Sequence, residues 1–213
     1  MTIRAVLFDI GGVLSLSPEA TEPAEAFDAM FARWEARQGT QGALTAYLEA
    51  SSMDGQLGRV SLDAWERGLA EAGRFEARDL SAFREEFWSI YLGAWNEPLG
   101  AWLAARRPGL RAGLLSNSFP GAREREEARF GLSARFDQLV YSHEVGLAKP
   151  DRRIFELACA RIETPPHEVV FVDDVPANVD AAASLGIRVV LFRATAQALR
   201  ELDALVPLPR SEP

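Results

Sequence analysis

The stretch RAVLFD at residues 4–9 is an unbroken apolar run that ends on an aspartate. Four similar runs follow it, at LRAGLLS (110–116), QLVYS (138–142), EVVFVD (168–173) and RVVLF (188–192). Runs that are apolar at every position are typical of strands buried on both faces. Helical patterns separate the later runs, at 120–130, 150–162 and 177–186. This alternation predicts an α/β fold with a Rossmann-like parallel sheet and helices on both faces.

The interval between the first two runs is far too long for a simple crossover. It holds no convincing strand but several amphipathic helical patterns, at 23–38, 42–51, 61–73 and 79–95. We therefore predict an inserted α-helical unit over residues 15–95, beside a core formed by residues 1–14 and 96–213.

The composition excludes several functional classes. The chain has 213 residues, with 23 basic and 31 acidic side chains and a net charge of −8. Such a balance argues against nucleic acid or an anionic membrane as the main partner. No apolar run approaches the length of about 18 residues that spans a bilayer, and the N-terminal segment resembles a strand rather than a secretion signal. These features predict a cytoplasmic protein.

Polar residues stand where the predicted strands end. Asp9 follows the first, Ser116 ends the second, Ser142 and His143 follow the third, and Asp173 and Asp174 follow the fourth. In an open parallel sheet, ligands bind outside the carboxyl ends of the strands. We therefore expect these residues to share one site.

The residue types at this edge indicate a phosphate site. Three carboxylates crowded together demand cations. With one cysteine and two histidines in the chain, oxygen ligands and a hard ion such as Mg²⁺ are favoured. Lys149 is the only lysine among 23 basic residues, and a compact ammonium beside a metal suits a dianion. The Gly11-Gly12 backbone can form an anion-binding concavity, and Asp9 could act as a nucleophile.

Four motifs carry a family resemblance: VLFDIGGVL (6–14), LLSNS (114–118), GLAKPDRRIF (146–155) and VVFVDDVPANVDAA (169–182). In this order and spacing they resemble the haloacid dehalogenase superfamily of hydrolases, which are mostly Mg²⁺-dependent phosphatases. The insertion resembles the small helical cap of that family, which closes over the active site and shapes substrate choice.

The resemblance implies a role for each matched position. Asp9 would attack phosphorus and contact the metal, and Lys149 would pair with both the nucleophile and the phosphate. Gly12, Ser116 and the amide of Asn117 would bind phosphate oxygens. Mg²⁺ would be held by the carbonyl of Gly11 and the carboxylate of Asp174, with Asp173 as a second ligand or an outer anchor. Asn178 would shape the loop around the metal.

One position departs from the phosphatase pattern. Gly11 stands where that pattern has a second Asp, the general acid for the leaving group. Loss of a positioned acid typically costs about 10²–10⁴ in rate. The chain resembles some sugar-1-phosphate phosphatases of the family, which also have Gly at the position of the second Asp. We therefore expect a slow or selective phosphatase that acts on small phosphomonoesters of the sugar phosphate class through an aspartyl-phosphate on Asp9.

Two other functions stay open at this point. A metal-independent 2-haloacid dehalogenase would attack carbon with Asp9, and a non-catalytic phospho-ligand-binding module would keep the site without turnover. Gly11 is the best argument for the second of these.

Two groups of residues are predicted to have no role in the chemistry. The acidic run EREE (124–127) is interpreted as the solvated face of a helix. Trp34, Tyr47, Trp65 and Phe119 are predicted to pack in the interior rather than to face a substrate.

Overall fold

The computed structural model describes residues 2–16 and 23–206, and its main sheet within these residues has five strands. Their order is β5-β4-β1-β6-β7, and each neighbouring pair is parallel. The strands are β1 (Ala5–Phe8), β4 (Arg111–Ser116), β5 (Gln138–Tyr141), β6 (Val169–Asp173) and β7 (Arg188–Leu191). The five predicted strands are confirmed, and the first of them lies at the centre of the sheet.

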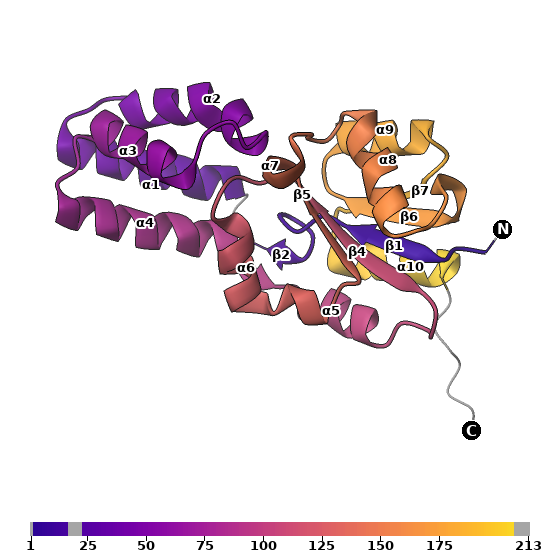
Figure 1. Ribbon diagram of the computed structural model, residues 1–213. Helices are drawn as coiled ribbons and strands as arrows, with labels where there is room; N and C mark the ends of the chain where they lie inside the picture. Colours follow the sequence, from indigo (N-terminus) through magenta and orange to yellow (C-terminus); the bar gives the residue numbers. More distant parts are fainter. Residues whose placement is uncertain (1, 17–22, 207–213) are drawn as a thin grey trace.

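Both faces of the sheet are buried, as the unbroken apolar runs predict. Along β1, Val6 and Phe8 belong to one hydrophobic cluster, while Ala5 and Leu7 belong to the other. The first cluster packs beneath α5 (Glu97–Ala104) and α10 (Thr195–Leu205), and the second beneath α8 (Arg152–Arg161) and α9 (Pro176–Ser184). Figure 1 shows these two pairs of helices on opposite sides of the strands. The α/β prediction is confirmed.

Four helices stand beside the sheet rather than on it (Figure 1). They are α1 (Pro23–Gln38), α2 (Ala43–Gln56), α3 (Leu62–Gly73) and α4 (Ala77–Leu92), and we call them the helical lobe. Their interior is largely aromatic, and it includes the buried rings of Trp34, Trp65, Phe83 and Phe87. The lobe therefore has a hydrophobic core of its own, as expected for an inserted unit. The division at residues 15–95 stays a prediction.

A short antiparallel ladder lies where the chain leaves and re-enters the core. Its strands are β2 (Ser15–Leu16) and β3 (Ala94–Trp95), with Ser15 opposite Trp95. The expectation of no strand in this interval was wrong, because two residues are too few to show a periodicity. Just after β3, the buried Asn96 side chain donates to the carbonyl of Val13 at 2.8 Å, which ties both connections together.

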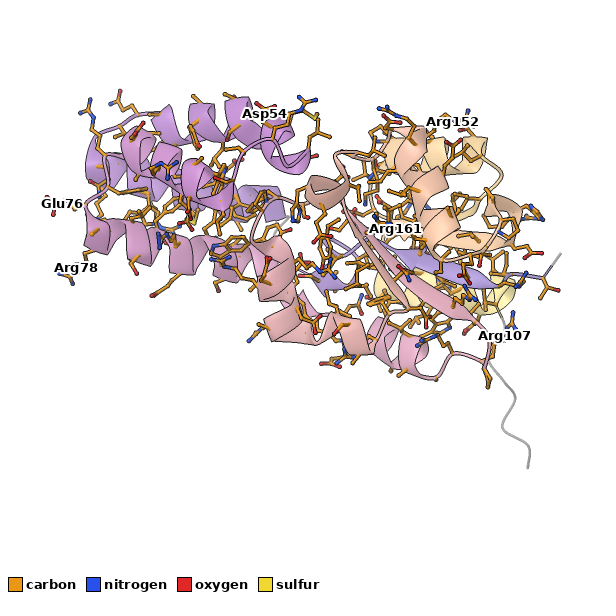
Figure 2. The ribbon with its side chains drawn as sticks, viewed as in Figure 1. Asp54, Glu76, Arg78, Arg107, Arg152 and Arg161 are labelled. Carbon is orange, nitrogen blue, oxygen red and sulfur yellow. The ribbon has the colours of Figure 1, made fainter. Side chains whose placement is uncertain are left out.

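The remaining elements are short helices. They are α6 (Ala122–Phe130), α7 (Ser142–Val145) and two 3₁₀ turns at Leu132–Ala134 and Pro166–Glu168. Charged side chains such as Glu76, Arg78 and Arg152 project outward from the helices (Figure 2). Among the described residues, no helix is both long enough and apolar enough to span a membrane.

Candidate active site

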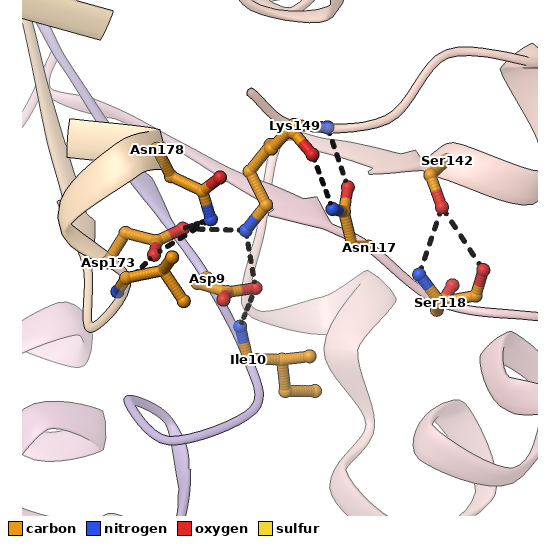
Figure 3. Close-up of polar contacts among 9 residues, drawn as sticks. Asp9, Ile10, Asn117, Ser118, Ser142, Lys149, Asp173 and Asn178 are labelled. Atoms are coloured by element: carbon orange, nitrogen blue, oxygen red, sulfur yellow. Dashed lines mark hydrogen bonds and ion pairs between the residues drawn. The ribbon is translucent and has the colours of Figure 1, made fainter. Parts of the chain in front are cut away.

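The polar residues predicted from the strand ends meet at one edge of the sheet (Figure 3). Asp9 follows β1, Asp173 ends β6, and Lys149 lies between α7 and α8. The ammonium of Lys149 is 2.9 Å from Asp9 Oδ1 and 2.7 Å from Asp173 Oδ2. Residues separated by more than 100 positions in the sequence therefore form one ionic cluster. The strand ends predict the places of Asp9 and Asp173, and Lys149 joins them from the connection between α7 and α8.

Lys149 is buried, with only 1% of its side chain exposed. Burial alone would lower the pKa of this amine, but the charges of Asp9 and Asp173 outweigh it and raise the pKa above its ordinary value. The side chain of Asn117 fixes the backbone on both sides of the residue, accepting from Lys149 N at 2.8 Å and donating to Lys149 O at 2.9 Å. Sequence reasoning missed this positioning role of the Asn117 side chain.

The carboxylate of Asp173 is fully engaged by donors of the protein. Its Oδ1 accepts from the amide of Val175 at 2.8 Å, and Asn178 donates to both oxygens at 3.1 Å. Lys149 takes the remaining position at Oδ2. With no part of the residue exposed, Asp173 has the surroundings of an anchor that orients Lys149.

Asp9 is the carboxylate at the centre of the cluster. Its Oδ1 accepts from the amide of Ile10 at 2.8 Å and contacts Lys149. Burial raises the pKa of Asp9 to about 7, against the opposing effect of Lys149 and with a further increase from Asp173 and Asp174. A further cation beside this carboxylate would favour its ionised form at neutral pH.

The acidic residues fit a magnesium ion. One oxygen each from Asp9, Asp173 and Asp174 lie within 4.8 Å of one another. The loop after β1 is shaped around them, because a Cβ on Gly12 would stand 2.2 Å from Asp174 Oδ2. Gly12 also has a φ of +73°, which favours glycine. These carboxylate oxygens, with the carbonyl of Gly11 that the resemblance implies, are the kind of ligands that Mg²⁺ prefers in proteins.

A cavity of about 310 Å³ opens beside this cluster, and we call it the Asp9 cavity. Its wall includes Asp9, Gly11, Gly12, Ser116, Asn117 and Asp174. All the predicted phosphate-binding residues except Lys149 therefore line one space, and Lys149 touches Asp9 directly behind it. Gly11 has open space where its Cβ would stand.

A second cavity, of about 370 Å³, lies beside the first, and we call it the aromatic cavity. Phe27, Tyr91 and Asn117 line both. Trp65 and Phe119 also line the aromatic cavity, while Trp65 is buried in the hydrophobic cluster of the helical lobe and Phe119 packs against it, as predicted. Trp34 is buried in the helical lobe, as predicted, and Tyr47 donates to the carbonyl of Trp65 at 2.9 Å.

Ser142 and His143 stabilise the loop that follows β4. Ser142 Oγ accepts from the amide of Ser118 at 2.9 Å (Figure 3), and the Ser118 hydroxyl lies 2.9 Å from Nδ1 of His143. Burial lowers the pKa of His143, which favours a neutral ring in this position. Both residues therefore support the loop that follows β4, through their contacts with Ser118.

Glu126 corrects the interpretation of the acidic run on α6. The residue is buried, with 2% exposure, and lines the Asp9 cavity. Tyr141 donates to its Oε2 at 2.7 Å, and Tyr91 of the helical lobe interacts with the same carboxyl group. Ala122 and Phe130, four residues before and after it, are also buried. That spacing is the signal in the sequence that could have placed Glu126 on the inner face.

We expect Glu126→Gln to change how the stability of the protein depends on pH. Burial raises the pKa of Glu126 from 4.5 to about 7, against hydrogen bonds from Tyr141 and Tyr91 and with a smaller increase from Asp9. The folded state therefore binds this proton more tightly than the unfolded state, and its stabilising effect is lost as pH rises through 7. Between pH 5 and pH 8, the free energy of unfolding of the wild type should fall relative to that of the variant by on the order of 3 kcal/mol.

Urea unfolding of both proteins at pH 5 and pH 8 measures this effect. Glu124→Gln, an exposed change on the same helix, is the matched control and should follow the wild type at both pH values. An equal difference between wild type and Glu126→Gln at the two pH values would contradict the prediction.

Comparisons with known proteins agree with this geometry. Residues 3–186 match the family described as "Hydrolase: haloacid dehalogenase-like hydrolase". A phosphoserine phosphatase of Thermus thermophilus is 34% identical over 208 residues, covering 88% of this chain and 80% of the relative. Bifunctional epoxide hydrolase 2 of Sus scrofa is 30% identical over 221 residues, covering 95% of this chain but only 39% of the relative.

The chain thus spans about two fifths of that hydrolase. Among solved structures, a haloacid dehalogenase (HAD) family enzyme of Bacteroides thetaiotaomicron, in complex with magnesium and inorganic phosphate, superposes on this chain with a TM-score of 0.68. It is 21% identical, and the match covers 90% of this chain and 95% of that one. The likeness shows a shared fold. The chain belongs to the haloacid dehalogenase-like hydrolase family.

Proposed function

We propose that this hydrolase is a Mg²⁺-dependent phosphatase that acts on small phosphomonoesters. The observation that carries the proposal is the position of Lys149, which bridges Asp173 and Asp9, the latter a residue that lines the Asp9 cavity. A buried ammonium between two carboxylates, with Asp174 in the same group, suits a phosphoryl dianion and a divalent cation. The phosphatase among the relatives supports the same reaction class.

The residues then take the following roles. Asp9, Asp174 and the carbonyl of Gly11 would hold Mg²⁺, while Asp173 anchors Lys149. When bound, the ion would neutralise phosphoryl charge and orient the phosphate oxygens. Ser116 and the backbone amide of Asn117 donate hydrogen bonds to those oxygens, as the resemblance implies, whereas the amide of Gly12 already donates to the carbonyl of Ser15 at 2.9 Å.

Asp9 performs the covalent step. Its carboxylate oxygen bonds to phosphorus as the bond from phosphorus to the ester oxygen breaks, which gives an aspartyl-phosphate and an alcohol. The ester oxygen takes its proton from solvent, because Gly11 has no side chain to donate one. Water then attacks phosphorus, which releases inorganic phosphate and restores Asp9.

The missing acid at Gly11 predicts a dependence on the leaving group. Phenolic and anomeric oxygens leave with little protonation, whereas an alkoxide needs a proton. We therefore expect aryl phosphates and sugar 1-phosphates to be hydrolysed faster than alkyl phosphates, by about 10²-fold. Phosphate release from phenyl, glucose 1- and ethyl phosphate, with Mg²⁺ and with a chelator, measures this order. Equal rates for the three esters would contradict the role given to Gly11.

Two further measurements separate the phosphatase from the other two functions. Gly11 favours one of them, a phospho-ligand-binding module, because the usual acid is missing. Binding of orthovanadate without turnover of any ester would support that module. Release of halide from 2-chloropropionate in the presence of the chelator would instead support a dehalogenase.

A further inference from the structure

The aromatic cavity lies next to the place where phosphate would bind. Asn117 lines both cavities, and so do Phe27 of α1 and Tyr91 of α4. A phosphoryl group beside Asp9 therefore has the aromatic cavity as its neighbouring space. The group attached to the phosphate would extend into it.

The lining of this cavity is aromatic and uncharged. Six of its thirteen lining residues carry rings, and none of the thirteen has a formal charge. Phe119 lies at the centre of the group, with its ring centroid 5.2 Å from that of Trp65 and 5.0 Å from that of Tyr91. The polar side chains that α2 contributes are Ser51, Ser52 and Gln56. Ring edges and faces in this arrangement suit another ring.

The same lining disfavours other phosphate esters. Phosphoserine would bring an ammonium and a carboxylate into a space with no charged partner, at a high desolvation cost. A sugar phosphate would bring several hydroxyl groups against six ring side chains, with Ser51, Ser52 and Gln56 as the polar partners on α2, and every hydroxyl group left without a partner costs free energy. A neutral aromatic group makes neither demand.

The volume of the aromatic cavity limits the size of the leaving group that it can hold. A cavity of about 150 Å³ holds benzene, and the aromatic cavity measures about 370 Å³. One or two fused rings therefore fit.

We propose that the substrate of this phosphatase is an aryl phosphomonoester whose neutral one- or two-ring leaving group occupies the aromatic cavity. Two separate features agree on this class. Gly11 favours an acidic leaving group, and of the two acidic classes, phenols and anomeric sugars, the cavity selects the phenols. This inference rests on the proposed phosphatase activity and names its substrate class, in place of the sugar phosphates expected from the resemblance.

Gly55→Leu tests the proposal by filling the cavity. Gly55 lies in α2, and a Cβ there would meet only Phe119 Cβ, at an ordinary 3.5 Å. Leucine also favours a helix more than glycine does, so the variant should fold. Ala50→Leu, at an exposed position of the same helix outside the cavity lining, is the matched control.

The assay compares 1-naphthyl phosphate, which needs the cavity, with acetyl phosphate, which has a good leaving group and is too small to need it. For Gly55→Leu, we expect kcat/KM to fall by about 10-fold or more on naphthyl phosphate and to stay unchanged on acetyl phosphate. Wild type and Ala50→Leu should hydrolyse naphthyl phosphate faster than glucose 1-phosphate or phosphoserine.

Each contrary outcome has its own meaning. If wild type hydrolyses acetyl phosphate but prefers glucose 1-phosphate or phosphoserine to naphthyl phosphate, the substrate class is wrong and the phosphatase activity stands. The same conclusion follows if Gly55→Leu affects naphthyl and acetyl phosphate equally, or affects neither. Absence of turnover on every ester and on acetyl phosphate would overturn both proposals.

Discussion

Replacing Asp9 by Asn should reduce Mg²⁺-dependent phosphate release by about 10⁴-fold or more, because an amide cannot supply the nucleophilic oxygen. The substitution keeps the shape of the side chain and an oxygen that can accept from Ile10 N. Lys149 keeps its contact with Asp173 at 2.7 Å, so the ammonium is not left without a partner. The loss should therefore come from chemistry and not from unfolding.

Two measurements check this result. Phosphate release gives the rate, and intact-protein mass spectrometry after a rapid acid quench detects the phosphorylated enzyme in wild type and its absence in Asp9→Asn. Asp180→Asn makes the same chemical change at an exposed position of α9 and should leave the rate unaltered. Asp9→Asn turnover within 10-fold of wild type would rule out covalent catalysis at this residue.

Lys149→Met should cause the largest combined loss of stability and activity. The change leaves the carboxylates of Asp9 and Asp173 side by side with no ammonium between them, in a place where 1% of the lysine side chain is exposed. Removing one partner of a buried ionic cluster costs about 3–5 kcal/mol. Loss of a fixed positive charge next to the phosphoryl group should slow turnover by about 10³-fold.

The pH dependence identifies the cause of the instability. Without Lys149, Asp9 loses the partner that lowers its pKa, so this carboxylate should take up a proton more readily. Urea unfolding should therefore show a larger deficit at pH 8 than at pH 5. Arg152→Met removes a cation whose side chain is 64% exposed (Figure 2) and should cost little at either pH. A deficit that does not change with pH would contradict the electrostatic explanation.

The fold and the ionic cluster could be predicted from the sequence because both depend on short local patterns. Each strand of the main sheet is an unbroken apolar run, and parallel strands bring their carboxyl ends to one edge. That is sufficient to unite Asp9 and Asp173, whereas Lys149 lies between α7 and α8 and is assigned to the site from its charge and from the family motif. The β2–β3 ladder was missed because its strands are two residues long, and pairing between distant residues such as Ser15 and Trp95 leaves no local trace in the sequence.

The cavities could not be predicted, because they depend on how the helical lobe packs against the core. Helical spacing places Trp65 on an inner face, but it does not show whether that face meets another side chain or an open space. Glu126 is a similar case, since its acidic neighbours conceal a position whose partner, Tyr141, lies 15 residues away on β5.

The single lysine also makes this protein convenient to label. Amine-directed reagents find one side chain to modify, and in the folded state it is buried between Asp9 and Asp173. The rate of acylation of Lys149 would therefore report the fraction of molecules in which the contacts of Lys149 with Asp9 and Asp173 have opened. A bound inhibitor would slow this reaction in proportion to its occupancy.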